Sequence, residues 1–138
     1  MTSAQATEER RAGKVRVRYM VNAIEPAVSF YTKHLRFDAK VGANPNFALL
    51  TRGNLELVLS TPFGPGGAAK PMADGRKAEP GGWNRIILNV GDLQREVDRL
   101  RRAGLHFRSD ILTGPGGSEI LLDDPSGNPI ELFQPTRS

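Results

Sequence analysis

Two stretches of the chain repeat one order of apolar and polar positions. In the first, residues 15–21 alternate in the way that predicts a half-buried strand. An apolar stripe at helical spacing follows, formed by Ile24, Val28, Tyr31 and Leu35. Three short apolar segments then lie between Gly, Pro and Asn turns, at residues 37–41, 47–51 and 55–59. This order predicts a β-α-β-β-β unit.

The second stretch begins at residue 84 and follows the same order. Residues 84–90 predict a strand, and Asp92 is suited to cap the helix that follows. The buried stripe of this helix is formed by Leu93, Val97 and Leu100. Three further strands are expected at residues 105–108, 119–122 and 129–133. The second stretch therefore also predicts a β-α-β-β-β unit.

The spacing between equivalent residues supports a duplication. Arg16 and Arg85 are separated by 69 residues, and so are Val21 and Val90. Glu56 and Glu131, each preceded by a Gly-Asn turn, are separated by 75 residues. Spacings that hold within an element and change only across loops are typical of an internal repeat. We predict an α+β protein of two tandem βαβββ modules.

A loop rich in glycine and proline separates the two modules. Ten of its 23 residues, 61–83, are glycine or proline, which favours a linker or a lid over the ligand site. The predicted organisation is a flexible tail at residues 1–14, a first module at 15–60 and a second module at 84–135. At 138 residues, the two modules are expected to share one domain.

Composition excludes several classes of function. The chain contains no cysteine, which rules out disulfides and thiolate chemistry. The net charge of +4 is spread along the chain without a basic, aromatic-rich run, so we expect no nucleic acid partner. No apolar stretch is long enough to cross a membrane, and the polar start lacks a signal-peptide core. We therefore expect a cytoplasmic protein with no membrane partner.

The end of the chain carries a resemblance to a known family. It contains the run Asp124-Pro125-Ser126-Gly127-Asn128-Pro129-Ile130-Glu131-Leu132-Phe133, and related features lie at residues 21–31 and 90–93. On these residues the chain resembles the vicinal oxygen chelate superfamily of glyoxalases, bleomycin resistance proteins and dioxygenases. The resemblance implies a curled eight-stranded mixed sheet that encloses a cup, with a small-molecule ligand inside. It also implies a homodimer.

The resemblance further implies four positions at which metal-dependent members hold a divalent ion. These positions correspond to Arg16, Glu56, Arg85 and Glu131. A guanidinium group offers only donors and remains protonated, so arginine cannot ligate a metal. We therefore predict no metal centre and no other cofactor. If a metal binds, Glu56 and Glu131 are its expected ligands.

Two roles remain open for these charged residues. In one, Arg16 and Arg85 form ion pairs with Glu56 and Glu131 that replace the metal and hold the modules together. In the other, the arginines recognise an anionic or carbonyl-bearing ligand, and Glu131 is a catalytic general base. Further residues expected at the ligand are Met20, Phe47, Val58, Trp83 and Phe133. For Trp83 the alternatives are a core anchor and a stacking surface for a planar ligand.

We therefore predict a glyoxalase- and bleomycin-resistance-like protein that binds a small organic molecule without the usual His/Glu metal centre. The alternative is a glyoxalase-like lyase, isomerase or dioxygenase that uses Glu131, with or without a divalent metal. The sequence leaves open whether any reaction is catalysed. It also leaves the ligand unnamed.

Overall fold

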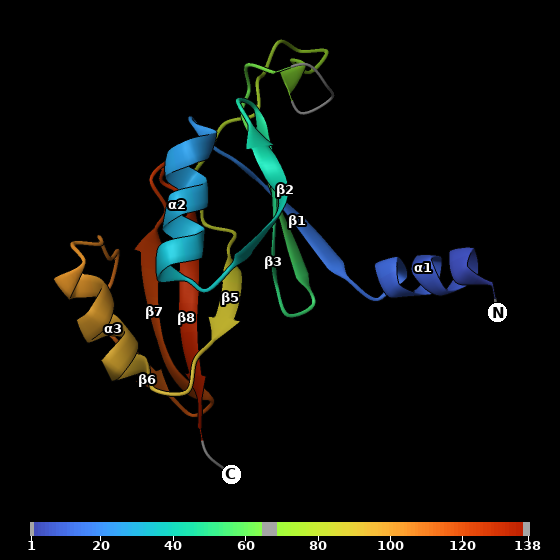
Figure 1. Cartoon of the computed structure of the whole chain (residues 1–138). Coiled ribbons are helices and arrows are strands. Elements are labelled where there is room, and N and C mark those ends of the chain that lie inside the picture. The colour runs from blue at the N-terminus through green and yellow to red at the C-terminus, as the bar shows by residue number, and fades with distance from the viewer. Residues whose placement is uncertain (1, 65–68, 137–138) are drawn as a thin grey trace. The chain divides into compact units, whose positions relative to one another are not determined.

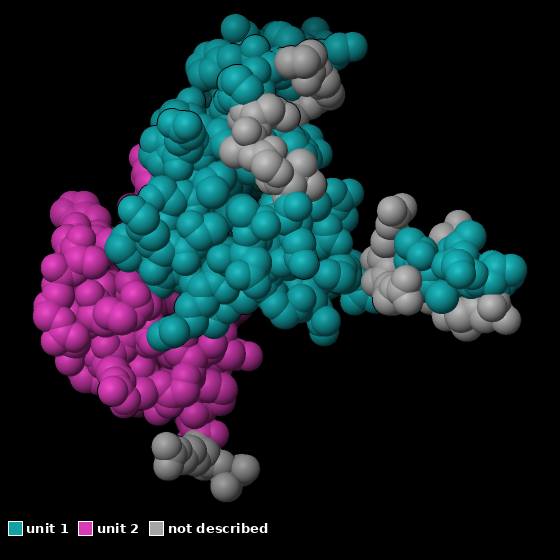
Figure 2. All heavy atoms as spheres, in the orientation of Figure 1, with its two compact units in different colours: residues 1–79 teal, residues 80–138 magenta. Residues whose placement is uncertain are grey.

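The computed structural model describes residues 2–64 and 69–136, apart from the side chains of residues 8–12 and 41–44. The chain divides into two compact units, residues 1–79 and 80–138, which Figure 2 shows in teal and magenta. The boundary lies inside the predicted loop at residues 61–83. Residues 65–68 of that loop are outside the described part of the chain.

The first unit contains a four-stranded mixed sheet and two helices (Figure 1). Its elements are α1 (Ser3–Ala12), β1 (Val15–Met20), α2 (Ile24–His34), β2 (Asp38–Asn44), β3 (Phe47–Arg52) and β4 (Leu55–Ser60). The strand order is β1-β4-β3-β2, with β1 parallel to β4 and the other pairs antiparallel. The parallel pairing of β1 and β4 requires the crossover through α2.

Strand alternation gives the first sheet two different faces. Tyr19, Leu59 and Ala48 are paired across β1, β4 and β3 on the face that α2 covers, and all are buried. Tyr31 of α2 packs edge-on against Phe37 with ring centroids 5.4 Å apart. The opposite face carries Glu56 and its neighbours at even-numbered positions of β1 and β4.

The second unit repeats this topology. Its elements are β5 (Ile86–Asn89), α3 (Leu93–Arg102), β6 (Leu112–Gly114), β7 (Gly117–Asp123) and β8 (Pro129–Pro135). The strand order is β5-β8-β7-β6, again with one parallel pair, β5 and β8. The two predicted βαβββ modules are therefore confirmed. Hydrogen bonding forms two four-stranded sheets, where a single eight-stranded sheet was expected.

Two side chains hold the start of α3 and show which face of β8 it covers. Asp92 accepts a hydrogen bond from the Arg95 amide at 3.1 Å, as the sequence predicted. Gln134 Oε1 accepts from the Leu93 amide at 2.8 Å, so the even-numbered side chains of β8 face the helix. Ile130 and Leu132 are buried on this side. Glu131 and Phe133 consequently lie on the other face of the sheet.

Two predicted elements need correction. The tail at residues 1–14 contains helix α1, for which Thr2 and Gln5 form reciprocal hydrogen bonds between side chain and backbone, a capping box. The strand expected at residues 105–108 is also wrong, because only Phe107 makes an isolated bridge there, to Leu122. The sixth strand is Leu112–Gly114, and it joins β7 through a tight turn.

None of the described helices is long and apolar enough to cross a membrane.

Candidate functional site

The first arginine–glutamate pair lies in the first unit. Arg16 on β1 is directly opposite Glu56 on β4, so the side chains share the face that α2 leaves uncovered. The separation between Arg16 Nε and Glu56 Oε2 is 3.9 Å, and the Arg16 side chain is 60% exposed. This is a loose ion pair in contact with solvent, and such pairs contribute little to stability.

The second pair is shorter and more buried. Arg85 immediately precedes β5, and its Nη2 and Nε atoms lie 3.0 and 3.1 Å from Glu131 Oε1. The Glu131 side chain is 6% exposed and that of Arg85 is 30% exposed. Arg85 Nη1 also donates to the backbone oxygen of Trp83 at 3.3 Å. Arg85 therefore connects β8 to the segment that precedes β5, with part of its side chain still open to solvent.

Both expected arginine–glutamate ion pairs form in the structure. Each pair lies within one unit, however, so neither pair joins the two modules. Arg16 and Glu56 belong to one sheet, and Arg85 and Glu131 belong to the second unit. The expectation that the pairs hold the modules together is therefore wrong. The reason is the parallel pairing of the first and last strands of each unit, which places each arginine beside the glutamate of its own sheet.

A second carboxyl group, Glu119, lies against Glu131. Glu119 on β7 is paired with Phe133, and Leu121 is paired with Glu131, so the two glutamates are diagonal neighbours on one face. A hydrogen bond with Glu131 raises the pKa of Glu119 above its ordinary value of 4.5. The charge of Glu131 and burial act in the same direction, while Arg85 opposes them. The result is an Arg85–Glu131–Glu119 cluster on the face of the second sheet that lies away from α3.

Glu119 was absent from the predicted site. Its alternation with Ile120 and Leu122, both buried, places it on the face away from the helix. That signal was readable from the sequence. Its proximity to Glu131 depends on the register between β7 and β8, which the sequence does not specify.

Trp83 is an exposed residue, with 70% of its surface open to solvent in the structure. The interpretation as a core anchor is therefore wrong. One face of its indole ring lies over the guanidinium of Arg108, with 4.8 Å between the Arg108 Cζ atom and the ring centroid. The backbone of Trp83 is held by Arg85, as described above.

The structure distributes the other predicted residues between two sheets. Met20, Phe47 and Val58 lie on the same face of the first sheet as Arg16 and Glu56, as the strand registers show. Val58 is buried, at 3% exposure. Phe133 lies on the face of the second sheet that carries Glu131 and Glu119. Each unit thus gathers its own predicted residues on the side opposite its central helix.

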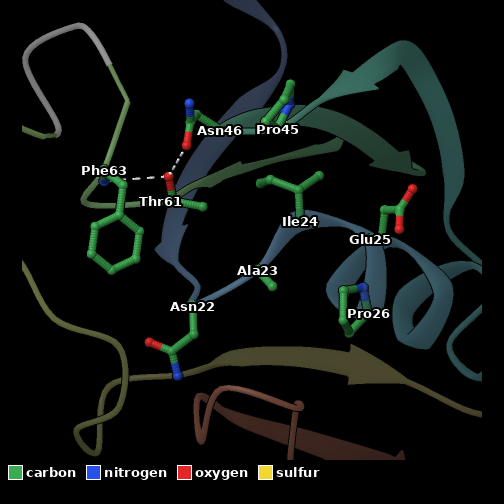
Figure 3. Close-up of a pocket in the computed structure, with 9 residues that line it drawn as sticks. All are labelled: Asn22, Ala23, Ile24, Glu25, Pro26, Pro45, Asn46, Thr61 and Phe63. Atoms are coloured by element: carbon green, nitrogen blue, oxygen red, sulfur yellow. Dashed lines mark hydrogen bonds between the residues drawn. The ribbon is translucent and has the colours of Figure 1, made fainter.

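A separate pocket of about 460 Å³ lies in the first unit, at the start of α2 (Figure 3). Thr61 is among its lining residues and donates a hydrogen bond to Asn46 Oδ1 at 2.6 Å. Phe63 stands beside it with 77% of its surface exposed. The predicted site residues are not among the described residues that line this pocket.

The four positions that correspond to metal ligands in metal-dependent members of the superfamily do not fit a metal ion in this chain. Two of the four are arginines, and each guanidinium is already paired with the glutamate that would be a ligand. Over residues 2–64 and 69–136, no group of three His, Cys, Asp or Glu side chains is arranged to hold a metal. The donor chemistry favours charge pairing within each sheet.

Comparison with known proteins assigns the family. The model of the Glyoxalase/Bleomycin resistance protein/Dioxygenase superfamily matches residues 14–132. The chain belongs to this superfamily. The resemblance carried by the closing Asp-Pro-Ser-Gly-Asn run is therefore confirmed. No curated protein sequence matches the chain.

Solved structures of other proteins share the fold. A superfamily member from Sphaerobacter thermophilus is 24% identical, with a TM-score of 0.70 over 88% of this chain and 95% of that chain. Lactoylglutathione lyase from Agrobacterium tumefaciens is 16% identical, with a TM-score of 0.69 over 87% and 91%. TnmS3, an antibiotic binding protein from Streptomyces sp. CB03234, is 22% identical, with a TM-score of 0.66 over 89% and 95%. At these identities the likeness shows the fold alone, which the chain shares with a lyase and with a binding protein.

Proposed function

We propose that this superfamily member binds a small planar organic molecule on the second unit, without a metal centre. The observation that carries the proposal is the combination of an exposed Trp83 with Arg85, whose guanidinium contacts the Trp83 backbone and the Glu131 carboxylate. The indole offers a stacking surface, and the guanidinium offers donors to a carbonyl or anionic group. The antibiotic binding protein among the similar structures supports a binding role.

The charge of the cluster defines the ligand further. Arg85 and Glu131 compensate each other, and about a third of the Arg85 side chain, 30%, is still available to a ligand. A free carboxylate or carbonyl gains a donor there, whereas an ammonium group meets a cation. We therefore expect neutral carbonyl-bearing or anionic planar molecules to bind better than cationic ones.

Calorimetric titration with four probes tests this proposal. Naphthamide and naphthoate are expected to bind, naphthylmethylamine more weakly, and the non-planar cyclohexanecarboxylate not measurably. Trp83→Leu should weaken naphthamide binding by about three- to tenfold, the usual contribution of an aromatic pair. Phe63→Leu is the matched control, because Phe63 is also exposed but lies in the first unit. Unchanged affinity in Trp83→Leu would contradict the proposal.

Metal analysis tests the second part of the proposal. Protein purified without chelator is expected to contain no stoichiometric divalent metal, because the arginines compete for both glutamates. A stoichiometric divalent ion that is lost in a Glu56→Gln, Glu131→Gln double variant would overturn the metal-free site. It would favour a metalloenzyme instead.

A second candidate function is proton-transfer catalysis as a lyase or isomerase of the superfamily. The specific observation in its favour is that Glu119 and Glu131 are diagonal neighbours on one face of the second sheet, because adjacent carboxyls can act as a base and an acid. In this role Glu131 is the general base that accepts a proton, and Glu119 is the neighbouring carboxylic acid. The similarity to lactoylglutathione lyase makes lactoylglutathione the first substrate to test. Turnover that is lost in Glu131→Gln, with folding retained, would support catalysis, and equal turnover would exclude Glu131 as the base.

We also propose a homodimer, as the resemblance implies, and a cytoplasmic location, as the composition of the chain predicts. Light scattering coupled to gel filtration should give twice the mass of the chain. Cell fractionation should place the protein in the soluble fraction. A monomer across the micromolar range would contradict the dimer.

A further inference from the structure

Arg108 joins three segments of the second unit that are distant in sequence. Its Nε donates to Asp123 Oδ1 at 2.6 Å, and Nη2 donates to the Gly127 oxygen at 2.9 Å. Nη1 donates to the Gly82 oxygen at 3.0 Å. The face of the same guanidinium packs under the Trp83 ring. The planar group therefore fixes both the backbone before Trp83 and one face of its side chain.

The turn that receives Arg108 is itself held in place. Asp124 Oδ1 accepts from the amides of Ser126 and Asn128, both at 2.9 Å, and Asp124 and Asn128 are buried. Asn128 Oδ1 accepts from the Gly81 amide at 2.7 Å. Two tethers, one from Arg108 and one from Asn128, thus attach residues 81–83 to the same turn. The closing motif that identifies the superfamily also anchors the end of the loop between the modules.

We infer that Arg108 is a positioning residue that holds Trp83 as a one-faced platform for the ligand. This inference rests on the proposed function, because Trp83 is the stacking surface there. Arg108 covers one face of the indole and leaves the other to solvent, so a planar ligand meets a ring that is already oriented. Fixing the ring before binding reduces the loss of conformational freedom on binding. Arg108 touches no ligand and acts only through Trp83.

The free protein gives a direct test, because Trp83 is the only tryptophan in the chain. Arg108→Lys keeps the positive charge and the partner Asp123, but loses the planar fork and the surface under the ring. We expect a loss of tryptophan fluorescence anisotropy and a larger acrylamide quenching constant. The matched control is Arg101→Lys, because the Arg101 guanidinium lies over Phe107 at 5.4 Å and does not contact Trp83 in the structure. The control should keep the wild-type anisotropy and quenching.

Ligand binding to the same variants then shows whether the ordering of Trp83 by Arg108 affects affinity. With naphthamide as the probe, Arg108→Lys should weaken binding by about three- to tenfold, the range of a cation–π contact and the ordering it gives. Asp123→Asn retains the guanidinium and should give a smaller change in both measurements, which provides a milder variant if Arg108→Lys folds poorly.

Each result has a defined consequence. Unchanged anisotropy and quenching in Arg108→Lys overturn the platform. Changed fluorescence with unchanged naphthamide affinity overturns the positioning role in binding. If the wild type binds none of the four probes, the proposed function fails, while the fluorescence of the free variants still decides whether Arg108 orders Trp83.

Discussion

The two units place an arginine and a glutamate at equivalent positions, but the surroundings of the pairs differ. In the first unit the charged atoms are 3.9 Å apart and Arg16 is 60% exposed. In the second they are 3.0 Å apart and Glu131 is 6% exposed. The position equivalent to Glu119 is Leu49, which is paired with Val58 as Glu119 is paired with Phe133. The glutamate of the pair therefore has an apolar neighbour, Leu49, in the first unit and a second carboxyl, Glu119, in the second unit.

The turns that lead into the last strand of each unit also differ, because the turn of the first unit is exposed and that of the second is buried. The first unit uses a short turn at Gly53 and Asn54, both exposed, with Gly53 at a φ of 57°. The second unit uses the longer turn around Asp124 and Asn128, both buried, which receives Arg108. Gly127 and Asn128 of the second turn attach the segment that precedes Trp83. This contrast is why we assign ligand binding to the second unit.

The largest expected effect comes from removing the cation of the second pair. Arg85→Met leaves Glu131 buried beside Glu119 without its counter-charge, and should lower the free energy of unfolding by about 3 kcal/mol. Arg16→Met should cost less than about 1 kcal/mol, because the first pair is open to solvent. Urea unfolding followed by Trp83 fluorescence measures the second unit directly, and far-ultraviolet circular dichroism measures both. Equal losses in the two variants would contradict the comparison.

The next effect concerns the turns. Asp124→Ala removes the acceptor of two backbone amides and of the Asn128 side chain in a buried turn, and should cost about 2 kcal/mol. It should also release the Trp83 segment and lower the tryptophan anisotropy. Asn54→Ala in the exposed turn of the first unit is the control and should change stability by less than about 0.5 kcal/mol. A similar cost for both variants would show that the second turn has no special role.

The internal repeat made most of the fold predictable from the sequence. The constant spacing from Arg16 to Arg85 predicted two equivalent modules, and alternation predicted the buried faces of their strands. Strand β6 was missed because its three residues are all exposed and carry no apolar alternation. Helix α1 was missed although the Thr2–Gln5 capping box was readable.

The contacts that distinguish the second unit depend on register and on distant segments. Glu119 meets Glu131 only through the alignment of β7 with β8. Arg108 contacts Gly82 and Gly127, which are 26 and 19 residues away in the chain. Neither relation follows from local periodicity. The sequence could therefore predict the arginine–glutamate positions, but not the groups that make one pair different from the other.

The smallest expected effect concerns Glu119 and separates charge from hydrogen bonding. Because contact with Glu131 raises the pKa of Glu119 in the folded state, its contribution to stability is complete below about pH 4.5. That contribution is lost as the pH rises through the raised pKa. Glu119→Gln keeps a donor toward Glu131 without the second charge, so its stability should fall less with rising pH. At neutral pH it should exceed the wild type by up to about 1 kcal/mol, since the pair is partly open to solvent.

Glu119→Leu places the residue of the first unit, Leu49, at the equivalent position of the second. It removes the titrating carboxyl and also the hydrogen bond to Glu131, so it should flatten the same pH dependence without the full gain at neutral pH. Urea midpoints of the wild type and both variants, measured from pH 4 to pH 8, distinguish the two contributions. If both variants kept the wild-type slope, like-charge contact between the carboxyls would not be its source. If Leu matched Gln at neutral pH, the contact of residue 119 with Glu131 would contribute through its charge and not through a hydrogen bond.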